Sequence, residues 1–424
     1  MRPHRTPAKR SRERGATLIF MAAGMTALFL LFAMAIDLGI GWVARSRLNK
    51  AADAAALVAV KYASQGNAAM EAAAHAIGNA NKPGATFVTT ITSGANDVTV
   101  VRVEARTEVP TLFGRFAGVT NFNVAAAAEV TRFPLDMSLV LDISSSMVRT
   151  NSFNAMQEAA KTFLSLFDEK RDQVGIVAFA TTAYDVLRIK KGFKTEGAAD
   201  IDALKPYPDT NLSHGLQLGH LQLLSAPVRS GGGGRRLVLV LFTDGRPTAF
   251  TGTFSNIQQP DCGEAGPASY TGALSAFIYG PPLRALSEPD ANGNTRRIQC
   301  FVGGTPTFTD IPVPAPYSPY PNTLPDGTAP NGDNVRAYAR QVLLNEANST
   351  RNDHATIYTI GLGDPHATYV EDTPDQDLLR QVANESGVVD ASQPQGQMFF
   401  APDSSTLEMM FQQVAARILT RVTM

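Results

Sequence analysis

Three short polar segments, far apart in the chain, carry side chains that could together hold a hard metal ion. The first, Asp142-Ile143-Ser144-Ser145-Ser146, follows the apolar stretch Met137 to Leu141. Alternate residues of a tight turn can point inward together, which here offers one carboxylate and two hydroxyls. Magnesium requires near-octahedral oxygen coordination and keeps several waters, so small oxygen ligands after a strand suit it. Asp and Ser also begin helices by accepting hydrogen bonds from free N–H groups, and this segment alone does not separate the two interpretations.

The other two segments favour the metal. Asp209-Thr210-Asn211 precedes an amphipathic stretch, Leu212 to Leu224, and the apolar run Leu237 to Phe242 ends in Thr243-Asp244-Gly245. In an open α/β sheet, ligands gather at the carboxyl ends of the strands. We therefore expect Asp142 and Asp244 to lie side by side, with Thr210 on a neighbouring loop.

The order of these segments resembles that of von Willebrand factor type A domains with a metal-ion-dependent adhesion site. That family has an Asp-x-Ser-x-Ser loop, a Thr on a later loop and an Asp after an apolar strand. The resemblance covers roughly Pro134 to the C-terminus and implies a Mg²⁺ (or Mn²⁺) ion whose shell an acidic side chain of a protein partner completes. The metal ligands that it implies are Asp142, Ser144, Ser146, Thr210 and Asp244.

The sequence also predicts the strands and helices that must position these residues. Apolar or alternating stretches predict strands, and apolar residues at helical spacing predict helices, in alternation along the chain. This pattern indicates an α/β fold with a doubly wound, mainly parallel sheet. The predicted strands are Val174 to Ala180, Tyr184 to Ile189, Ala355 to Leu362 and Met398 to Ala401, and the predicted helices include Asn151 to Phe167, Gln376 to Ser386 and Ser404 to Leu419.

A long Pro- and Gly-rich insertion, at about 246–333, interrupts this pattern after Asp244. It is far longer than a usual connecting loop. It could shape ligand choice at the metal face, or it could be a partly disordered surface excursion. Both cysteines of the chain, Cys262 and Cys300, fall within it and predict a disulfide if the compartment is oxidising.

The other end of the chain sets the compartment. Residues 1–14 are strongly basic, and no charge appears from Ala16 to Ile36, long enough for a helix to cross the hydrocarbon core of a membrane. We predict a transmembrane helix at 15–43 with a cytoplasmic N-terminus and an exported remainder. A cleaved signal peptide is the alternative, because Ala33-Met34-Ala35 has the form of a cleavage site. Asp37, near the exit of the span, is interpreted as a solvated or snorkelling group rather than an intramembrane functional acid.

Between the span and the type A region, residues 44–133 predict a stalk. Its Ala-rich beginning favours a continued helix, because Ala has the highest helix propensity. Three alternating segments then predict a small antiparallel unit, which gives the preceding region an α+β character. They are Phe87 to Ile91, Val98 to Glu108 and Asn123 to Thr131.

Two motifs around the span resemble TadG-like proteins of the Flp (Tad) pilus assembly machinery. They are Ile36-Asp37-Leu38-Gly39 and the run from Asn49 to Ala56 with its Ala-Ala-Asp-Ala-Ala-Ala core, and they combine with Arg14-Gly15 and the apolar run, so the resemblance covers Arg14 to Ala56. Such proteins commonly carry a C-terminal type A domain. The resemblance implies a single-pass protein of the bacterial inner membrane with its bulk in the periplasm or beyond it, and pilus components as partners. Related pilins are cleaved after a Gly and have a Glu a few residues further on. The residues after Gly15, Ala16 to Phe20, contain no Glu, so this chain departs from the pattern for pilin processing.

Composition and missing motifs narrow the function further. The chain has 37 basic and 38 acidic residues among 424, so no bulk charge favours nucleic acid as a partner. No nucleophile elbow, zinc-protease helix or phosphate-binding loop is present, and His214 and His220 have a spacing unsuited to a shared metal, so we expect no enzyme. The classes that stay open are an adhesion or assembly factor, a scaffold whose metal only stabilises the fold, and a metal-dependent hydrolase with Asp364 as its base.

Overall fold

The computed structural model describes residues 12–94, 97–229, 234–255, 269–275, 287–289, 295–297, 307–308, 332–364 and 373–421. They belong to two compact units, one made of Met1–Ser93 and Thr99–Arg132 and the other of Gly94–Val98 and Phe133–Met424. Cys262 and Cys300 lie outside the described residues, so the disulfide between them stays a prediction.

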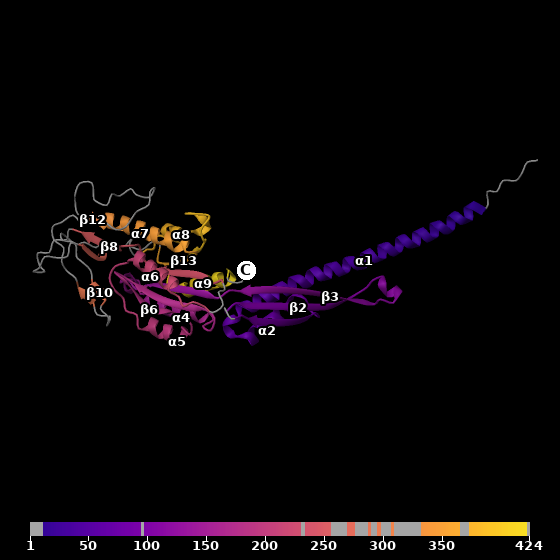
Figure 1. Ribbon diagram of the computed structural model, residues 1–424, viewed down its shortest axis with the longest axis horizontal. Coiled ribbons are helices and arrows are strands. Elements are labelled where there is room, and N and C mark those ends of the chain that lie inside the picture. Colours follow the sequence, from indigo (N-terminus) through magenta and orange to yellow (C-terminus); the bar gives the residue numbers. More distant parts are fainter. Residues whose placement is uncertain are drawn as a thin grey trace, which may run out of the picture. The chain divides into compact units, whose positions relative to one another are not determined.

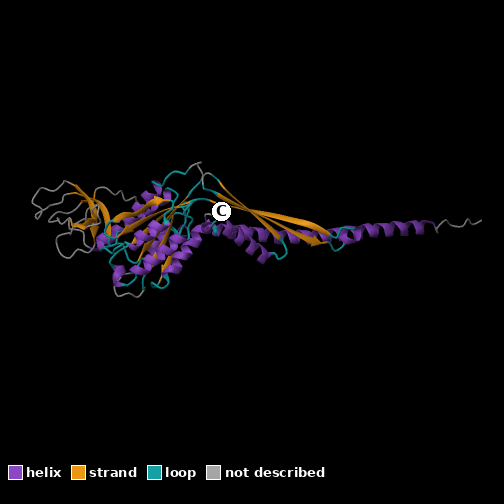
Figure 2. Ribbon diagram, turned by 90° about the horizontal axis from the view of Figure 1, so that it is seen from below, coloured by secondary structure: helices purple, strands orange, loops and turns teal. Residues whose placement is uncertain are grey.

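The first unit combines helices with one antiparallel sheet, as the alternating segments predict. Its strands pair in the order β1-β2-β3, and α1 runs along them and continues past the end of the β2–β3 hairpin (Figures 1 and 2). The elements are α1 (Arg12–Lys61), α2 (Asn67–Asn81), β1 (Thr86–Ser93), β2 (Thr99–Pro110), β3 (Asn121–Arg132) and the 3-10 turns η1 (Ala63–Gln65) and η2 (Gly114–Ala117).

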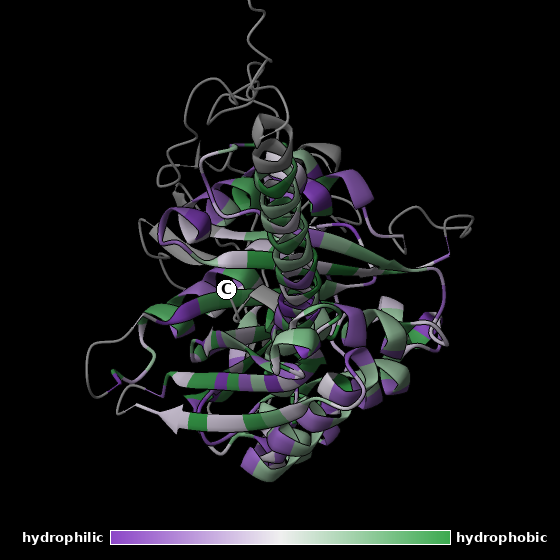
Figure 3. Ribbon diagram, turned by 90° about the vertical axis from the view of Figure 1, so that its right-hand side faces the viewer, coloured by the Kyte–Doolittle hydropathy of each residue, from purple (hydrophilic) through white to green (hydrophobic). Residues whose placement is uncertain are grey.

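Helix α1 has two unlike halves. Its Ala-rich half buries a stripe with helical spacing, which includes Leu48, Ala52, Ala55 and Ala59, in the same core as the sheet. Its other half is apolar and exposed, and it carries hydrophobic colours in Figure 3. By length and composition, this helix of the described chain could cross a membrane, over the 44 residues Leu18–Lys61.

The second unit is built on a six-stranded sheet in the order β14-β13-β7-β4-β5-β6. All neighbours are parallel except β5 and β6, which confirms the predicted mainly parallel sheet. Every residue of β4 and β5 is buried, as nearly continuous apolar strands require. The strands are β4 (Leu135–Asp142), β5 (Gln173–Phe179), β6 (Ala183–Lys190), β7 (Arg236–Thr243), β13 (Thr356–Leu362) and β14 (Gln397–Ala401).

Helices cover both faces of this sheet (Figure 2). Because successive strand residues point to opposite faces, Leu139 and Leu141 join one core while Val140 joins the other. Helices α4 (Phe153–Ser165), α5 (Lys194–Asp202) and α9 (Leu407–Arg421) contribute to the first core. Helices α6 (Leu212–Leu224), α7 (Gly332–Asn352) and α8 (Gln376–Ala383) contribute to the second.

The predicted insertion contains antiparallel strands that the sequence pattern did not predict. One sheet has the order β12-β8-β9, and β10 pairs with β11. The ring of Phe250 in β8 packs against that of Tyr338 in α7, with centroids 4.6 Å apart and planes inclined at 55°, so β8 contacts α7. The strands are β8 (Ala249–Ser255), β9 (Ser269–Ser275), β10 (Ser287–Pro289), β11 (Thr295–Arg297) and β12 (Thr307–Phe308).

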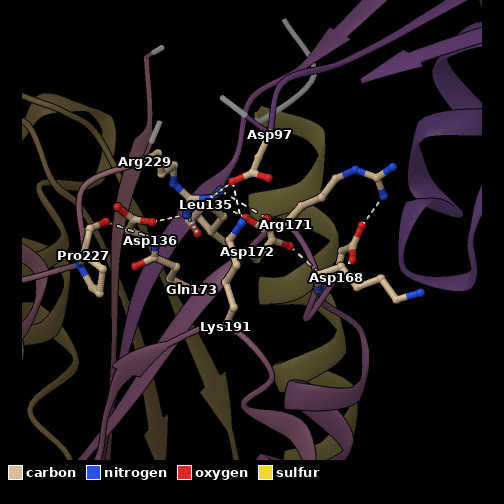
Figure 4. A network of polar contacts seen from close by, with 11 residues as sticks. Asp97, Leu135, Asp136, Asp168, Arg171, Asp172, Gln173, Lys191, Pro227 and Arg229 are labelled. Atoms are coloured by element: carbon tan, nitrogen blue, oxygen red, sulfur yellow. Dashed lines mark hydrogen bonds and ion pairs between the residues drawn. The ribbon is translucent and has the colours of Figure 1, made fainter. Parts of the chain in front are cut away.

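Ion pairs occupy the amino end of β4 (Figure 4). Asp136 is fully buried and contacts the guanidinium of Arg229, whose side chain is also buried, and that of Arg235, whose Nη1 lies 3.1 Å away. Asp172 holds the same strand end, because its Oδ1 accepts from the backbone N of Leu135 at 3.1 Å. Asp97 pairs with Arg229 at 3.1 Å, so this end of the sheet is a network of opposite charges.

Candidate metal centre

The carboxyl ends of β4 and β7 bring two carboxylates together. The strands are parallel neighbours, with Leu141 opposite Phe242, so Asp142 and Asp244 leave the sheet side by side. Both residues are buried, with exposed fractions of 0% and 1%. The two candidates that are 102 positions apart in sequence are therefore placed by the register of the sheet.

Hydroxyl groups join the two carboxylates. Ser146, at the start of the short helix α3 (Ser146–Arg149), donates from Oγ to Asp244 Oδ1 at 2.7 Å. Ser144 Oγ lies 2.7 Å from Ser146 Oγ and 3.3 Å from Asp244 Oδ1, and the Ser144 backbone N donates to Asp142 Oδ1 at 2.7 Å. The structure thus places Asp142, Ser144, Ser146 and Asp244 in one continuous set of contacts.

Thr210, the fifth candidate, lies on a loop tied to both of these strand ends. Its backbone N donates to Thr248 Oγ1 and its carbonyl accepts from Thr248 N, each at 2.9 Å, four residues beyond Asp244. Nearby, Tyr207 N donates to the carbonyl of Ile143 at 2.9 Å. The loop is thereby fixed between the Asp142 turn and the segment that follows Asp244, with Thr210 itself buried.

The start of α6 explains why this loop turns where it does. Asn211 is the N-cap of α6, and its side chain accepts from His214 N at 3.1 Å. Gly219 lets the helix approach β4 closely, because a Cβ there would lie 2.6 Å from Val140 Cγ2. Asp209 has φ of 62°, a conformation that Asp adopts more readily than most residues, which reverses the chain just before Thr210.

Thr243 is a site residue that the sequence reasoning missed. It is fully buried, and its Oγ1 donates to Asp142 Oδ2 at 2.6 Å and accepts from Gly245 N at 3.2 Å. It thus fixes the carboxylate oxygen that the Ser144 N–H does not contact. The feature of the sequence that could have indicated Thr243 is its place as a polar residue at the end of an apolar strand, directly before Asp244.

Burial dominates the electrostatics of the centre. Desolvation raises the pKa of Asp142 to about 6, against the opposing effect of the hydrogen bonds from Thr243 and Ser144. A cation beside the carboxylates would relieve that cost. The donors are all hard oxygens, and no group of three or more His, Cys, Asp or Glu among the described residues is arranged so that it could hold a metal ion. A donor set of carboxylates and hydroxyls suits Mg²⁺ or Mn²⁺. Zinc sites are typically built from nitrogen and sulfur ligands instead.

The other candidate groups have separate environments. His214 Nδ1 accepts from Ala183 N at 3.0 Å, and burial lowers its pKa. His220 lies between Glu346 and Asp353 of the α7 region, at 3.1 and 2.9 Å. Asp364, the candidate base of a hydrolase, is exposed just beyond β13.

Two family models match the chain. Residues 137–246 match the von Willebrand factor type A domain, a range that spans all five candidate ligands. The second unit contains a von Willebrand factor type A domain. Residues 40–129 match the putative Tad-like Flp pilus-assembly family, so the chain joins a Tad-like region to the type A domain, as both sequence resemblances predicted.

Several solved structures are similar to this chain, at low sequence identity and with TM-scores below 0.5. The pilus adhesin SpaC from Lactobacillus rhamnosus GG, in its open conformation, is 13% identical with a TM-score of 0.42, covering 81% of this chain and 35% of the adhesin. The PilB minor pilin from Streptococcus sanguinis is 14% identical with a TM-score of 0.41, covering 80% and 79%. Proximal thread matrix protein 1 from the mussel byssus, with a zinc-occupied MIDAS motif, is 14% identical with a TM-score of 0.36, covering 68% and 46%.

This chain therefore spans about a third of the length of the SpaC adhesin. None of the curated proteins matches it.

Proposed function

We propose that this protein is a membrane-anchored, extracytoplasmic assembly or adhesion factor of a surface pilus, whose type A domain binds a protein partner in a metal-dependent way. The observation that carries the metal dependence is the set of contacts that joins Asp142, Ser144, Ser146 and Asp244 where β4 and β7 end. The Tad-like match at 40–129 supports the pilus context.

Each residue of the centre has a role in the proposed binding. Asp142, Ser144, Ser146, Thr210 and Asp244 would hold Mg²⁺ or Mn²⁺. The bound ion would supply a Lewis-acidic position for an acidic side chain of the partner. Thr243 and the Ser144 N–H hold the two oxygens of Asp142 in place, so that the carboxylate is preorganised. Ser144 and Ser146 supply neutral oxygens, so the two carboxylates only balance the charge of a divalent ion and no net negative charge repels an anionic ligand.

The proposed location follows from α1. Its exposed apolar half would cross the bacterial inner membrane once, with the N-terminus in the cytoplasm and both compact units outside. The division into a tail at 1–14, a span at 15–43, a stalk at 44–133 and a type A domain at 134–424 is part of this proposal. Pilus components are the proposed partners.

The first test measures stability and binding of the full chain in detergent micelles. Mg²⁺ or Mn²⁺ is expected to raise the melting temperature in a concentration-dependent way, because binding to the folded state alone stabilises by mass action, by about 2.7 kcal/mol at 100 times Kd. Asp142→Ala is expected to abolish this rise. Asp377→Ala is the matched control, because it removes a carboxylate that is exposed and forms only a surface ion pair.

Binding to purified pili, with Mg²⁺ or with chelator, separates adhesion from a scaffold role. The proposal expects chelator and Asp142→Ala to weaken binding at least about tenfold, as the loss of a metal-bridged contact of roughly 1.4 kcal/mol or more requires. Unchanged binding in chelator, together with lowered stability, would contradict it and indicate a metal that only supports the fold.

A further inference from the structure

The loop between β2 and β3 presents apolar side chains to its surroundings. Leu112, Phe113, Phe116 and Val119 have exposed fractions of 46%, 38%, 80% and 52%. Arg115 is exposed beside them, with its Cζ 5.3 Å from the centre of the Phe116 ring. Exposed apolar residues that occur singly need no explanation, but a group of them on one short loop indicates a contact surface.

This loop is closed by its own hydrogen bonds. Thr111 donates from N to the carbonyl of Thr120 at 2.9 Å and from Oγ1 to that of Val119 at 2.5 Å, while Val119 N donates to Gly114 O at 3.0 Å. Gly118 has φ of 84°, which the turn requires and glycine tolerates. Because the backbone is fixed in this way, the apolar side chains are held outward.

Asp37 attaches the loop to α1. Its Oδ1 accepts from Leu112 N at 2.7 Å, and its Oδ2 accepts from Phe113 N at 3.1 Å and from Gly114 N at 2.7 Å. The residue is only 9% exposed, so the expectation of a solvated or snorkelling carboxylate is wrong, because a sequence-distant loop supplies the donors. Close by, Gly41 makes room for Phe122 at the start of β3, whose ring a Cβ would approach to 2.5 Å.

The position of Asp37 along α1 determines the height of the β2–β3 loop along that helix. The exposed apolar stretch Leu18–Ile36 ends immediately before it. At 1.5 Å per residue this stretch is about 28 Å long, close to the roughly 30 Å thickness of a hydrocarbon core. Trp42, five residues beyond Asp37, is 74% exposed, and Trp is enriched at membrane interfaces. The loop is therefore held at the height where the proposed span leaves the bilayer.

We propose that the loop Leu112–Thr120 is a second membrane contact, which inserts into the outer surface of the bilayer that α1 crosses. The loop contacts lipid. Arg115 contacts lipid phosphate, and the apolar side chains lie at the boundary of the acyl chains; these are Leu112, Phe113, Phe116 and Val119. Continuity with the exposed apolar face of α1 favours lipid over a second protein. Asp37 is the positioning residue, and the two contacts together fix the orientation of the first unit on the membrane. The inference rests on the proposed membrane span.

The test uses the full chain in phosphatidylcholine vesicles with brominated acyl chains, which quench indole fluorescence on contact. Trp42 is the single tryptophan of the chain, so the unaltered protein reports on α1. The double variant Trp42→Phe/Phe116→Trp reports on the loop with an aromatic exchange at an exposed site. We expect Trp at 116 to be quenched as strongly as Trp42, within about a factor of two, as residues of one interface would be.

Val88 provides the matched control, because it is 55% exposed on β1 of the same sheet. It pairs with Glu104, six residues before the end of β2 and so about 20 Å from the loop. Trp42→Phe/Val88→Trp is expected to be quenched by aqueous iodide and not by the brominated lipid.

The possible outcomes separate the inference from the proposed span. Quenching of Trp42 by lipid, with Trp at 116 open to iodide, would overturn the loop contact and keep the span. Quenching of Trp42 with Trp at 116 protected from both quenchers would also overturn it, because protein would then cover the loop. If Trp42 itself escapes the lipid quencher, the span fails and the inference fails with it.

Asp37→Asn tests the positioning role, since its amide group would turn a donor toward backbone donors. We expect lipid quenching of Trp at 116 to fall at least about twofold while quenching of Trp42 in the single variant stays unchanged. An unaltered signal at 116 would exclude Asp37 as the group that holds the loop at the membrane.

Discussion

Strand β4 carries a buried carboxylate near each of its ends, and the two have opposite surroundings. Asp136 and Asp142 are both fully buried. At the amino end, the guanidinium group of Arg229 contacts Asp136 (Figure 4), and so does that of Arg235. At the carboxyl end, Asp142 accepts from the hydroxyl of Thr243 and from the backbone N of Ser144, which are neutral donors.

The difference teaches how one sheet can neutralise a buried carboxylate at one end and, by the contacts shown, leave another without a charged partner at the other. Removing a charge from water costs several kcal/mol unless a partner charge or good hydrogen bonds offset it. The arginines provide that partner for Asp136. Hydrogen bonds offset only part of the cost for Asp142, whose pKa burial raises to about 6. The surroundings of Asp142 can therefore accept an external cation, whereas Asp136 already has cationic partners.

The largest expected effect is on stability at the amino end. Asp136→Asn would leave the buried Arg229 with Asp97 as its one remaining carboxylate partner among the described residues, and we expect a loss of about 3 kcal/mol in the free energy of unfolding. Urea unfolding of the full chain in micelles with chelator measures it. Asp142→Asn is the paired variant, expected to change the metal-free stability by at most about 1 kcal/mol, because relief of a buried charge offsets a lost hydrogen bond. Equal losses in both variants would refute the comparison.

The next effect concerns metal affinity at the carboxyl end. Thr243→Val keeps the shape of the side chain but removes the donor to Asp142 Oδ2, and we expect Mg²⁺ or Mn²⁺ to bind about tenfold more weakly. Calorimetric titration measures the affinity. Thr359→Val is the control, because Thr359 is equally buried on the neighbouring β13 and donates to Leu379 O at 3.1 Å. It is expected to cost about 1 kcal/mol of stability with no change in affinity.

The smallest expected effect is the pH-dependent loss of the ion pairs that His220 forms with Glu346 and Asp353. Burial acts to lower the pKa of His220, but its contacts with Glu346 and Asp353 outweigh this and raise the pKa above its ordinary value of 6.5. The pair therefore stabilises fully below pH 6.5 and loses this contribution as pH rises through the folded pKa. We expect the stability difference between wild type and His220→Gln to shrink by up to about 1 kcal/mol with rising pH.

Urea unfolding of both proteins at intervals from about pH 6 to pH 9, which begins near the ordinary pKa of histidine and extends above it, checks this. A difference that stays constant or grows with pH would show that His220 contributes by packing alone. Glu346→Gln should reduce the pH dependence, because Glu346 is the more buried of the two acids.

Much of the architecture could be predicted because it follows local patterns. The apolar runs at Leu237 to Phe242 and Ala355 to Leu362 correspond closely to β7 and β13, and Leu212 to Leu224 coincides with α6. The strands β8 and β9 were missed, since their Pro-, Gly- and Thr-rich surroundings lack the alternation that marks a half-buried strand.

The candidate site divides in the same way. Asp142, Ser144 and Ser146 could be grouped from one short motif, and Asp244 from its place after an apolar strand. The structure places these four in contact, while their role as metal ligands, with Thr210, stays a prediction. Thr243 needed the structure, because nothing in its local sequence shows that its hydroxyl points at a carboxylate 101 positions earlier.

The sequence by itself determined which oxygen donors are candidate ligands, the α/β alternation and the uncharged stretch before Asp37, because each is a matter of residue type and short-range period. Only the tertiary structure decided which buried acids have arginines beside them, and that Asp37 holds the loop at Leu112 to Gly114. The physical reason is that the energy of a buried charge depends on its spatial neighbours, and strand register and loop closure bring these from distant parts of the chain.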